Sequence, residues 1–305
     1  MIGPTVNAAS FLMRLFRSSA GITPLLIPFV SGLVCVPQIR AQSLQEPARA
    51  FEVVSVKLHR ADDNRRSMPQ FLPGGRFVST GVPLRFLIAI AYNVGFQSVR
   101  LSGGPEWINS MDGVYDIEAT AAPGALPAGL ASNVRSERLR RMLQTLLAER
   151  FKLKVRRETK ELPVYTVTVA KTGLKLEKAK VEEKDCAEPG SPGVSCHTLM
   201  GGRGRGLHGE AVSLSDVLSY VENWTDHPLV DKTGIQGLYR IQTSGWLPIQ
   251  PGPPPPAGAK AEDGSDLADV PTLFTLFERL GLKLESQRAP VDVFVIDQVE
   301  KPSGN

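Results

Sequence analysis

The residues best suited to chemistry in this sequence are its three cysteines and four histidines. Histidine is a common general base and metal ligand, and a cysteine thiolate is both a nucleophile and a soft metal ligand. Cys186, Cys196, His197 and His208 have the side chains of a zinc site, but no short Cys-x2-Cys or His-x3-His unit anchors them. No histidine stands in a Gly-x-Ser-x-Gly or His-Glu-x-x-His context. We therefore assign no catalytic, cofactor-binding or metal-ligating residue from motifs.

Cys186 and Cys196 enclose a segment rich in proline, glycine and serine. In an oxidising compartment two cysteines at this separation typically form a disulfide that closes the loop. We predict this bond. It should contribute roughly 2–3 kcal/mol of stability, and most of its effect should be to stiffen the loop itself. The alternative is two independent thiols.

Two further motifs favour turns and loops over chemistry. Asp231-Lys232-Thr233-Gly234 has the letters of the phosphorylated aspartate of P-type cation pumps, but Ile235 follows where such pumps have threonine. A tight turn with Gly234 at positive φ is the preferred interpretation. The glycine-rich run 201–206 has neither the P-loop nor the dinucleotide spacing, and we expect a flexible loop.

A catalytic centre assembled from scattered residues would leave no motif. Glu106, Trp107, Asp112 and His59 are the set that we consider for such a centre, in a secreted hydrolase. A deep pocket lined by convergent carboxylates or a histidine would favour this alternative.

The hydrophobic pattern predicts the elements that position these residues. Alternating apolar residues predict strands over residues 51–57, 76–80, 115–119 and 239–242. Helical spacing predicts four helices, over residues 84–91, 136–147, 214–221 and 271–280. Ser136 caps the second of these helices, and Ser213 with Asp216 forms a capping box for the third. Two alternating patterns are typical of hairpins, formed by residues 153–155 with 164–169 and by residues 282–284 with 291–296.

Three sequence blocks recur at similar offsets, which predicts an internal duplication. Residues 113–117, 149–155 and 162–164 match residues 237–241, 278–284 and 289–291, at offsets of 124, 129 and 127 residues. The alternative is that any helix followed by a hairpin has similar apolar spacing. We predict an α+β fold of two tandem, related units, each with a small, mainly antiparallel sheet covered by two helices.

The expected organisation has four parts. They are a signal peptide over residues 1–41, a first unit over 50–180, a loop with the disulfide over 181–206, and a second unit over 207–305 with a Pro-rich insertion at 247–268.

Residues 1–41 have the features of a secretion signal. They contain no acidic residue, and the apolar run 22–36 is too short and too interrupted by proline to span a membrane. Ile39-Arg40-Ala41 predicts cleavage after Ala41. An uncleaved N-terminal anchor is the alternative, and a lipoprotein is less favoured because Cys35 follows a valine.

Removal of the signal makes the chain almost neutral. The sequence has 35 Lys and Arg against 31 Asp and Glu, but residues 1–41 hold three arginines and no acid, which leaves 32 against 31. A pI near 9.0 for the whole sequence therefore does not indicate a polyanion partner. We expect no nucleic-acid partner and no transmembrane segment in the mature chain, which is periplasmic or secreted.

Ordered sequence blocks along the mature chain resemble a family of exported, uncharacterised proteins found chiefly in soil acidobacteria. The matching blocks are residues 51–57, 73–77, 103–107, 147–153, 161–165, 230–234, 281–285 and 295–297. In that family this domain of unknown function also occurs fused to membrane metallopeptidases similar to the BlaR type, which implies a sensory use. The chain departs from the family at Arg156 and Gln298, where the family tends to have histidine. The resemblance assigns no activity.

The repeat unit also resembles the short periplasmic domain of secretins and TonB-dependent signalling receptors. Those domains bind partner proteins and are not enzymes. We therefore expect a non-catalytic binding or interaction module, without a cofactor, whose partner is a protein or a cell-envelope component. The alternatives are the secreted hydrolase and the sensor domain of an envelope signalling system. The sequence leaves the oligomeric state open.

Overall fold

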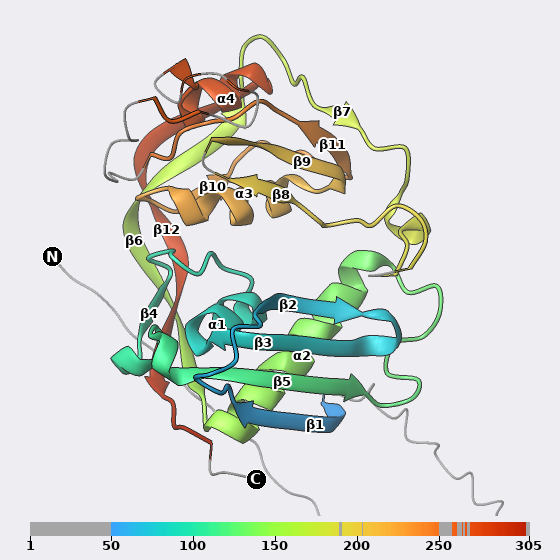
Figure 1. The fold of residues 1–305 in the computed structure, drawn as a ribbon. Coiled ribbons are helices and arrows are strands. Elements are labelled where there is room, and N and C mark those ends of the chain that lie inside the picture. Colours follow the sequence, from blue (N-terminus) through green and yellow to red (C-terminus); the bar gives the residue numbers. More distant parts are fainter. Residues whose placement is uncertain are drawn as a thin grey trace, which may run out of the picture. The chain divides into compact units, whose positions relative to one another are not determined.

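The computed structural model describes residues 50–188, 191–202, 204–249, 258–260, 264, 266 and 269–302. The predicted signal peptide and most of the Pro-rich insertion lie outside these residues. The described residues belong to one compact unit, Gln45–Asn305. They form a mixed α+β fold with three four-stranded sheets and four α-helices (Figure 1). None of these helices is long and apolar enough to cross a membrane.

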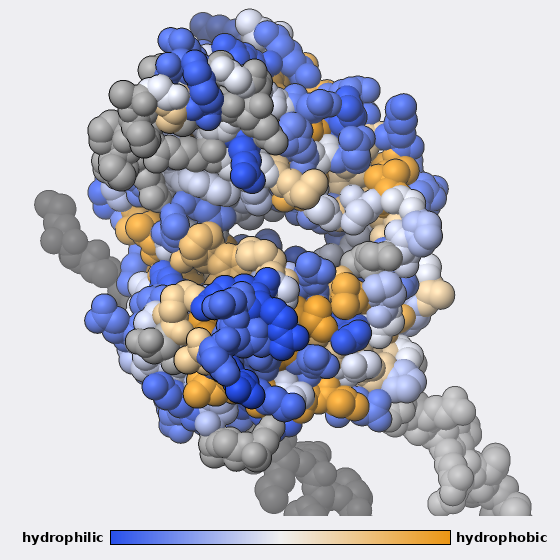
Figure 2. Space-filling model, viewed as in Figure 1, coloured by the Kyte–Doolittle hydropathy of each residue, from blue (hydrophilic) through white to orange (hydrophobic). Residues whose placement is uncertain are grey.

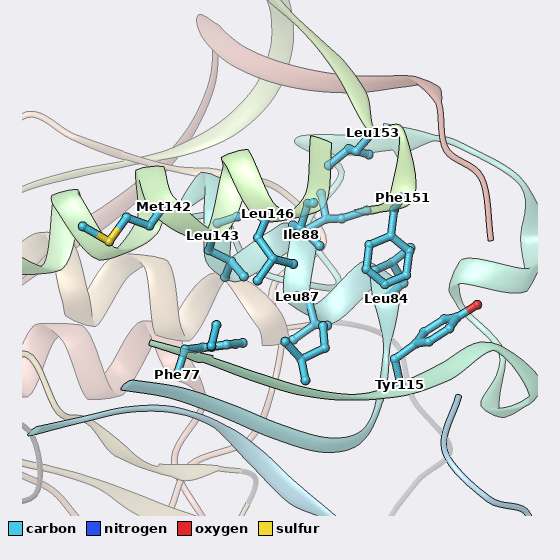
Figure 3. Close-up of a cluster of buried hydrophobic side chains, with 14 of the residues drawn as sticks. Phe77, Leu84, Leu87, Ile88, Tyr115, Met142, Leu143, Leu146, Phe151 and Leu153 are labelled. Carbon is cyan, nitrogen blue, oxygen red and sulfur yellow. The ribbon is translucent and has the colours of Figure 1, made fainter. Parts of the chain in front are cut away.

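The first sheet has the strand order β1-β5-β3-β2 and is antiparallel throughout. Its strands are β1 (Phe51–Leu58), β2 (Ser67–Leu72), β3 (Arg76–Pro83) and β5 (Val114–Ala121). Along β5, Tyr115, Ile117 and Ala119 are buried while Glu118 and Thr120 are exposed, because successive side chains point to opposite faces. The buried face packs against α1 (Leu84–Tyr92) and α2 (Ser132–Phe151), which form the core shown in Figure 3.

The third sheet has the order β7-β11-β9-β8. It consists of β7 (Glu177–Lys178), β8 (Met200–Gly202), β9 (Arg205–Val212) and β11 (Tyr239–Gln242). A second core packs around α3 (Leu214–Val221) and α4 (Leu273–Arg279). The predicted capping box begins α3, since Ser213 Oγ accepts from Asp216 N and the Asp216 carboxylate accepts from Ser213 N.

The middle sheet, β10-β6-β12-β4, joins the two cores. β6 (Lys154–Val169) and β12 (Leu282–Gln298) pair antiparallel along nearly their whole length. β10 (Leu229–Asp231) adds parallel to β6, and β4 (Leu101–Gly103) adds parallel to β12. Ile296 of β12 lies in the core of the first sheet, whereas Leu282 at the other end of β12 lies in the second core.

The two predicted hairpins are wrong, because each is a single long strand. Residues 156–161 of β6 are largely exposed and polar, so their sequence lacks the alternation that marks a half-buried strand. Hydrogen bonding to residues 290–295 of β12 keeps this segment extended. The pairing partner is therefore remote in sequence and could not be read from local pattern.

Two other differences from the prediction also have a tertiary cause. α2 begins at Ser132, one turn before the predicted cap Ser136, and its first turn contacts the loop after β7, where Asn133 N donates to the Glu183 carboxylate at 3.3 Å. β2 was not predicted because Pro69 interrupts its pattern. An edge strand tolerates proline, and β2 is at the edge of its sheet.

Candidate functional site

A pocket of about 780 Å³ lies beside the first sheet and α1. Its volume falls within the roughly 300–1,000 Å³ of small-molecule sites. Its lining comes from four separate segments and consists of Arg66, Ser67, Met68, Gly81, Val82, Pro83, Arg85, Phe86, Phe96, Gln97, Asn109 and Met111. Figure 2 shows hydrophobic atoms gathered beside a strongly hydrophilic group over this sheet.

The first turn of α1 forms one wall of the pocket. α1 buries Leu84, Leu87 and Ile88 against the sheet, which turns Arg85 and Phe86 to the opposite side of the helix. Asn93 ends α1 in the left-handed conformation, with φ 52°. The chain then returns alongside the helix, where the Phe96 ring packs on Phe86 with 5.0 Å between the ring centroids.

Arg85 fastens this returning segment to the helix. Its Nε donates to the Phe96 carbonyl at 3.1 Å, and its Nη2 donates to the Leu101 carbonyl at 2.5 Å. Burial lowers the pKa of Arg85, although a guanidinium stays protonated under all ordinary conditions. The position of the segment from Phe96 to Leu101 therefore depends on two hydrogen bonds from the Arg85 guanidinium to its main-chain carbonyls.

A bulge in β3 shapes the floor of the pocket. The pairing of β3 with β5 shifts register between Ser79 and Val82, and Gly81 within it has φ +62°. A Cβ at Gly81 would lie 3.1 Å from the His59 ring, so glycine suits both the conformation and the space. Bulges of this kind are over-represented next to functional sites. Arg66 Nη1 donates to the Gly81 carbonyl at 2.7 Å, which places Arg66 on the pocket lining.

His59 is buried behind this bulge. Its Nδ1 lies 2.8 Å from Asp116 Oδ1, and its Nε2 lies 2.9 Å from the Asp63 carbonyl oxygen. Burial opposes the charged imidazolium, but these two acceptors outweigh burial and raise the pKa of His59. Asp116 Oδ1 also accepts from Gly81 N at 2.9 Å. His59 thus orients the Asp116 carboxylate, which in turn holds the main chain of the bulge at Gly81.

The residues considered for a hydrolase do not meet in the pocket. Glu106 is exposed, and Trp107 is half-buried with Lys301 Nζ 5.6 Å from its ring centroid. His59 has both ring nitrogens occupied by Asp116 and Asp63, and it makes no polar contact with Glu106 or Trp107 among the described residues. The Asp112 side chain lies outside what the structure describes.

Arg66 and Arg85 give the pocket its charge. The ion pairs between described residues include a carboxylate partner for neither arginine. Their guanidinium groups donate to the main-chain carbonyls of Gly81, Phe96 and Leu101. The pocket therefore combines apolar side chains with two guanidinium groups.

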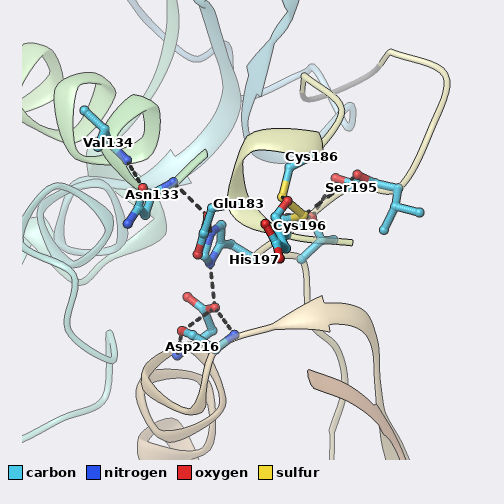
Figure 4. A network of polar contacts seen from close by, with 12 residues as sticks. Asn133, Val134, Glu183, Cys186, Ser195, Cys196, His197 and Asp216 are labelled. Carbon is cyan, nitrogen blue, oxygen red and sulfur yellow. Dashed lines mark hydrogen bonds and ion pairs between the residues drawn. A yellow bond between two sulfur atoms is a disulfide. The ribbon is translucent and has the colours of Figure 1, made fainter. Parts of the chain in front are cut away.

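Three of the four residues considered for zinc lie in the disulfide loop, whereas His208 lies in β9 and pairs with Met200 of β8. Cys186 and Cys196 are joined in a disulfide, with their Cα atoms 5.6 Å apart. His197 lies between Glu183 and Asp216, with Nε2 at 2.9 Å from the first carboxylate and Nδ1 at 2.7 Å from the second (Figure 4). Within the described residues no group of three or more His, Cys, Asp or Glu side chains is arranged to hold a metal.

His197 connects the disulfide loop to α3. Burial opposes its charge, but the Asp216 and Glu183 carboxylates outweigh burial and raise the pKa of His197 to about 9. In return, His197 and the capping residue Ser213 lower the pKa of Asp216 against the opposing effect of burial. Arg135 of α2 adds an ion pair with Glu188 at 3.1 Å.

Replacing both cysteines by alanine is expected to lower the free energy of unfolding by about 2 kcal/mol, because the bond closes a short loop in the unfolded chain. Urea denaturation of the Cys186→Ala/Cys196→Ala variant measures this loss. The pocket is formed by other segments, so binding of a pocket probe should not change. Unchanged stability together with a loss of pocket binding would contradict the prediction that the disulfide stabilises the fold and takes no part in the pocket.

The flexible loop predicted over residues 201–206 is wrong, because the described residues of this run end β8 and begin β9, which pair with each other. The other sequence motifs form a turn, an ion pair and a hydrogen bond. Asp231 Oδ1 accepts from Thr233 N at 2.8 Å and Gly234 has φ +70°, which is the tight turn that the sequence predicted. Arg156 pairs with Asp297 across the two long strands at 3.3 Å, and Gln298 donates to Glu300 at 2.7 Å.

The sequence analysis did not identify the pocket residues. Arg85 carried the one usable signal, since it stands in a helix whose other residues are apolar apart from a tyrosine, with no acidic residue in the first turn. Nothing local connects it to Arg66 or to Phe96, because their approach requires the bulge and the reversal after α1.

The fold and the pocket define an α+β protein with a ligand-sized, largely apolar cavity that two arginines line. The family model described as "Protein of unknown function (DUF3738)" matches residues 85–299, which is more than half of the chain, and the chain belongs to this family. No curated protein and no solved structure matches this chain.

Proposed function

We propose that this protein is an exported, non-catalytic binding module that takes up a small molecule in the pocket beside α1. The observation that carries the proposal is the pocket itself, which combines ligand-sized volume with apolar side chains and a few polar groups. Binding is favoured over hydrolysis because the described lining consists of apolar residues, two arginines, two amides and a serine, whereas His59 is held behind the floor.

Two features support an extracytoplasmic location. Residues 1–41 have the sequence pattern of a signal peptide, with cleavage expected after Ala41. The Cys186–Cys196 disulfide is compatible with an oxidising compartment. The partner in this proposal is a component of the cell envelope, which an exported module would meet.

The proposal includes an origin by duplication, with the two halves as related units. The two outer sheets, β1-β5-β3-β2 and β7-β11-β9-β8, have the same topology. In each sheet the four strands, counted in chain order, lie side by side in the order first, fourth, third, second. Leu162 pairs with Ala289 between the long strands, and these two residues begin the matching blocks at 162–164 and 289–291. Such a correspondence is expected of a duplicated unit whose copies pair about a common axis.

Titration with N-phenyl-1-naphthylamine, a neutral apolar fluorescent probe, tests the proposal. We expect saturable binding of the probe to the purified protein. Met68 lines the pocket and is 62% exposed, so Met68→Glu should weaken binding at least fivefold by placing a charge against the apolar probe. Met200 is 65% exposed but lies outside the pocket, and Met200→Glu should leave binding unchanged. Non-saturable fluorescence, or equal effects of both variants, would refute the proposal.

A further inference from the structure

The charge inside the pocket identifies the kind of molecule that it takes. Arg85 is half-buried and uses Nε and Nη2 on the carbonyls of Phe96 and Leu101. Its Nη1 has no partner among the described residues, and it is not among their fully buried unpaired atoms. Arg85, which lines the pocket, therefore keeps a guanidinium nitrogen that is not fully enclosed and has no hydrogen-bond acceptor among the described residues.

Arg66 adds a second cation at the exposed side of the pocket. One of its terminal nitrogens, Nη1, donates to the Gly81 carbonyl, and this bond orients the side chain. Two carboxylates of neighbouring segments have other partners, since Asp63 pairs with Arg65 at 2.7 Å and Asp116 pairs with His59 at 2.8 Å. Neither carboxylate lines the pocket.

The rest of the lining provides an apolar surface. The tilted ring pair Phe86 and Phe96, with Val82, Pro83 and the two methionines, contributes rings and alkyl groups. Methionine adapts its shape to varied apolar ligands. Gln97 and Asn109 are exposed and add amide groups. A fully hydrated ion would leave this apolar surface unused, and a neutral apolar molecule would leave the two cations uncompensated.

We propose that the pocket binds a small amphipathic carboxylate, with its apolar body against Phe86 and Phe96 and its head group on Arg85 and Arg66. This inference rests on the proposed function, because it names the ligand class of the same pocket. Carboxylate is the head group that a guanidinium fork matches with paired N–H donors. An amphiphile of this class is also a product expected from breakdown of envelope lipid.

Calorimetric titration with three probes of equal chain length tests the inference, each below its micelle concentration. The probes are decanoate, decanol and decyltrimethylammonium. We expect decanoate to bind at least tenfold more tightly than decanol at low salt, and the cation to bind more weakly than both. Equal affinity for decanoate and decanol, or a preference for the cation, would overturn the charge assignment.

Variants at Arg66 locate the charge effect. Arg66→Gln should weaken decanoate binding about fivefold to tenfold and leave decanol binding unchanged, and Arg66→Lys should restore part of the loss. Arg76 is an exposed arginine on β3 outside the pocket, and Arg76→Gln is the matched control with no expected effect. Unchanged decanol binding shows that each variant keeps a folded pocket.

The outcomes separate this inference from the proposed function. Binding of decanol without any preference for decanoate would remove the carboxylate assignment and keep a binding pocket. Failure of decanol and decanoate alike to bind would remove both. A tenfold decanoate preference that Arg66→Gln leaves intact would overturn the role of Arg66.

Discussion

Replacing Glu222 by alanine is expected to lower the free energy of unfolding by about 3–4 kcal/mol. The Glu222 side chain is only 3% exposed, in the turn after α3. It accepts from Ser98 Oγ and from Leu229 N at 3.2 Å, and Arg100 Nη1 lies 3.6 Å away. Alanine would leave one buried hydroxyl, one amide and a partly buried guanidinium without their acceptor.

Glu222 is expected to have this effect because its partners come from both halves of the chain. Ser98 and Arg100 follow α1, whereas Leu229 begins β10. Arg100 Nε also donates to the Asp292 carbonyl of β12 at 3.0 Å. Glu222→Ala should therefore lower the cooperativity with which the two cores unfold, as well as the total free energy of unfolding.

Urea denaturation followed by circular dichroism measures the effect. Glu222→Gln keeps the shape and an acceptor oxygen but removes the charge, and we expect a smaller loss of about 1–2 kcal/mol. Glu118 is an exposed glutamate on β5, and Glu118→Ala should change stability by less than about 0.5 kcal/mol. A Glu222→Ala loss no greater than that of Glu118→Ala would disprove the role of the network.

His197 is expected to make stability depend on pH between about 6.5 and 9. Its pKa rises from 6.5 to about 9 in the folded protein, because the Asp216 and Glu183 carboxylates outweigh burial. A raised folded pKa stabilises the protein fully below the unfolded pKa, and this stabilisation is lost as the pH rises through the folded value. The contribution should amount to about 2–3 kcal/mol at pH 6 and disappear near pH 10.

His197→Asn isolates this contribution, because asparagine tolerates the positive φ of 58° at this position. The difference in unfolding free energy between the native protein and the variant, measured at several pH values without reductant, should fall across this pH range. The pKa of His59 is also raised, but His59 is present in both proteins and cancels in the difference. A difference that is independent of pH would rule out the imidazolium as its source.

The Glu222 prediction concerns contacts that hold one wall of the pocket. The segment between Phe96 and Leu101 carries pocket residues, and Ser98 in its middle donates to Glu222. Arg85 holds the same segment from the other side. A weakened Glu222 network is therefore expected to loosen one wall of the pocket, whereas the His197 network braces the disulfide loop.

Local sequence determined the elements whose signals lie within a few residues. The helical spacing at 84–91 gave α1, the pair Ser213 and Asp216 gave the start of α3, and alternation at 115–119 gave the centre of β5. The separation of Cys186 and Cys196 predicted a disulfide that the structure contains. Periodicity, capping and short loop closure act over one or two turns of chain, so a single sequence records them.

Only the tertiary structure decided the long strands and the pocket. Residues 156–161 are extended because β12 pairs with them, although about 130 residues separate the partners along the chain. Arg66, Arg85 and Phe96 line one cavity because a bulge at Gly81 and a reversal at Asn93 bring three segments together. Register and approach between distant segments depend on the packing of the whole core, which local sequence does not encode.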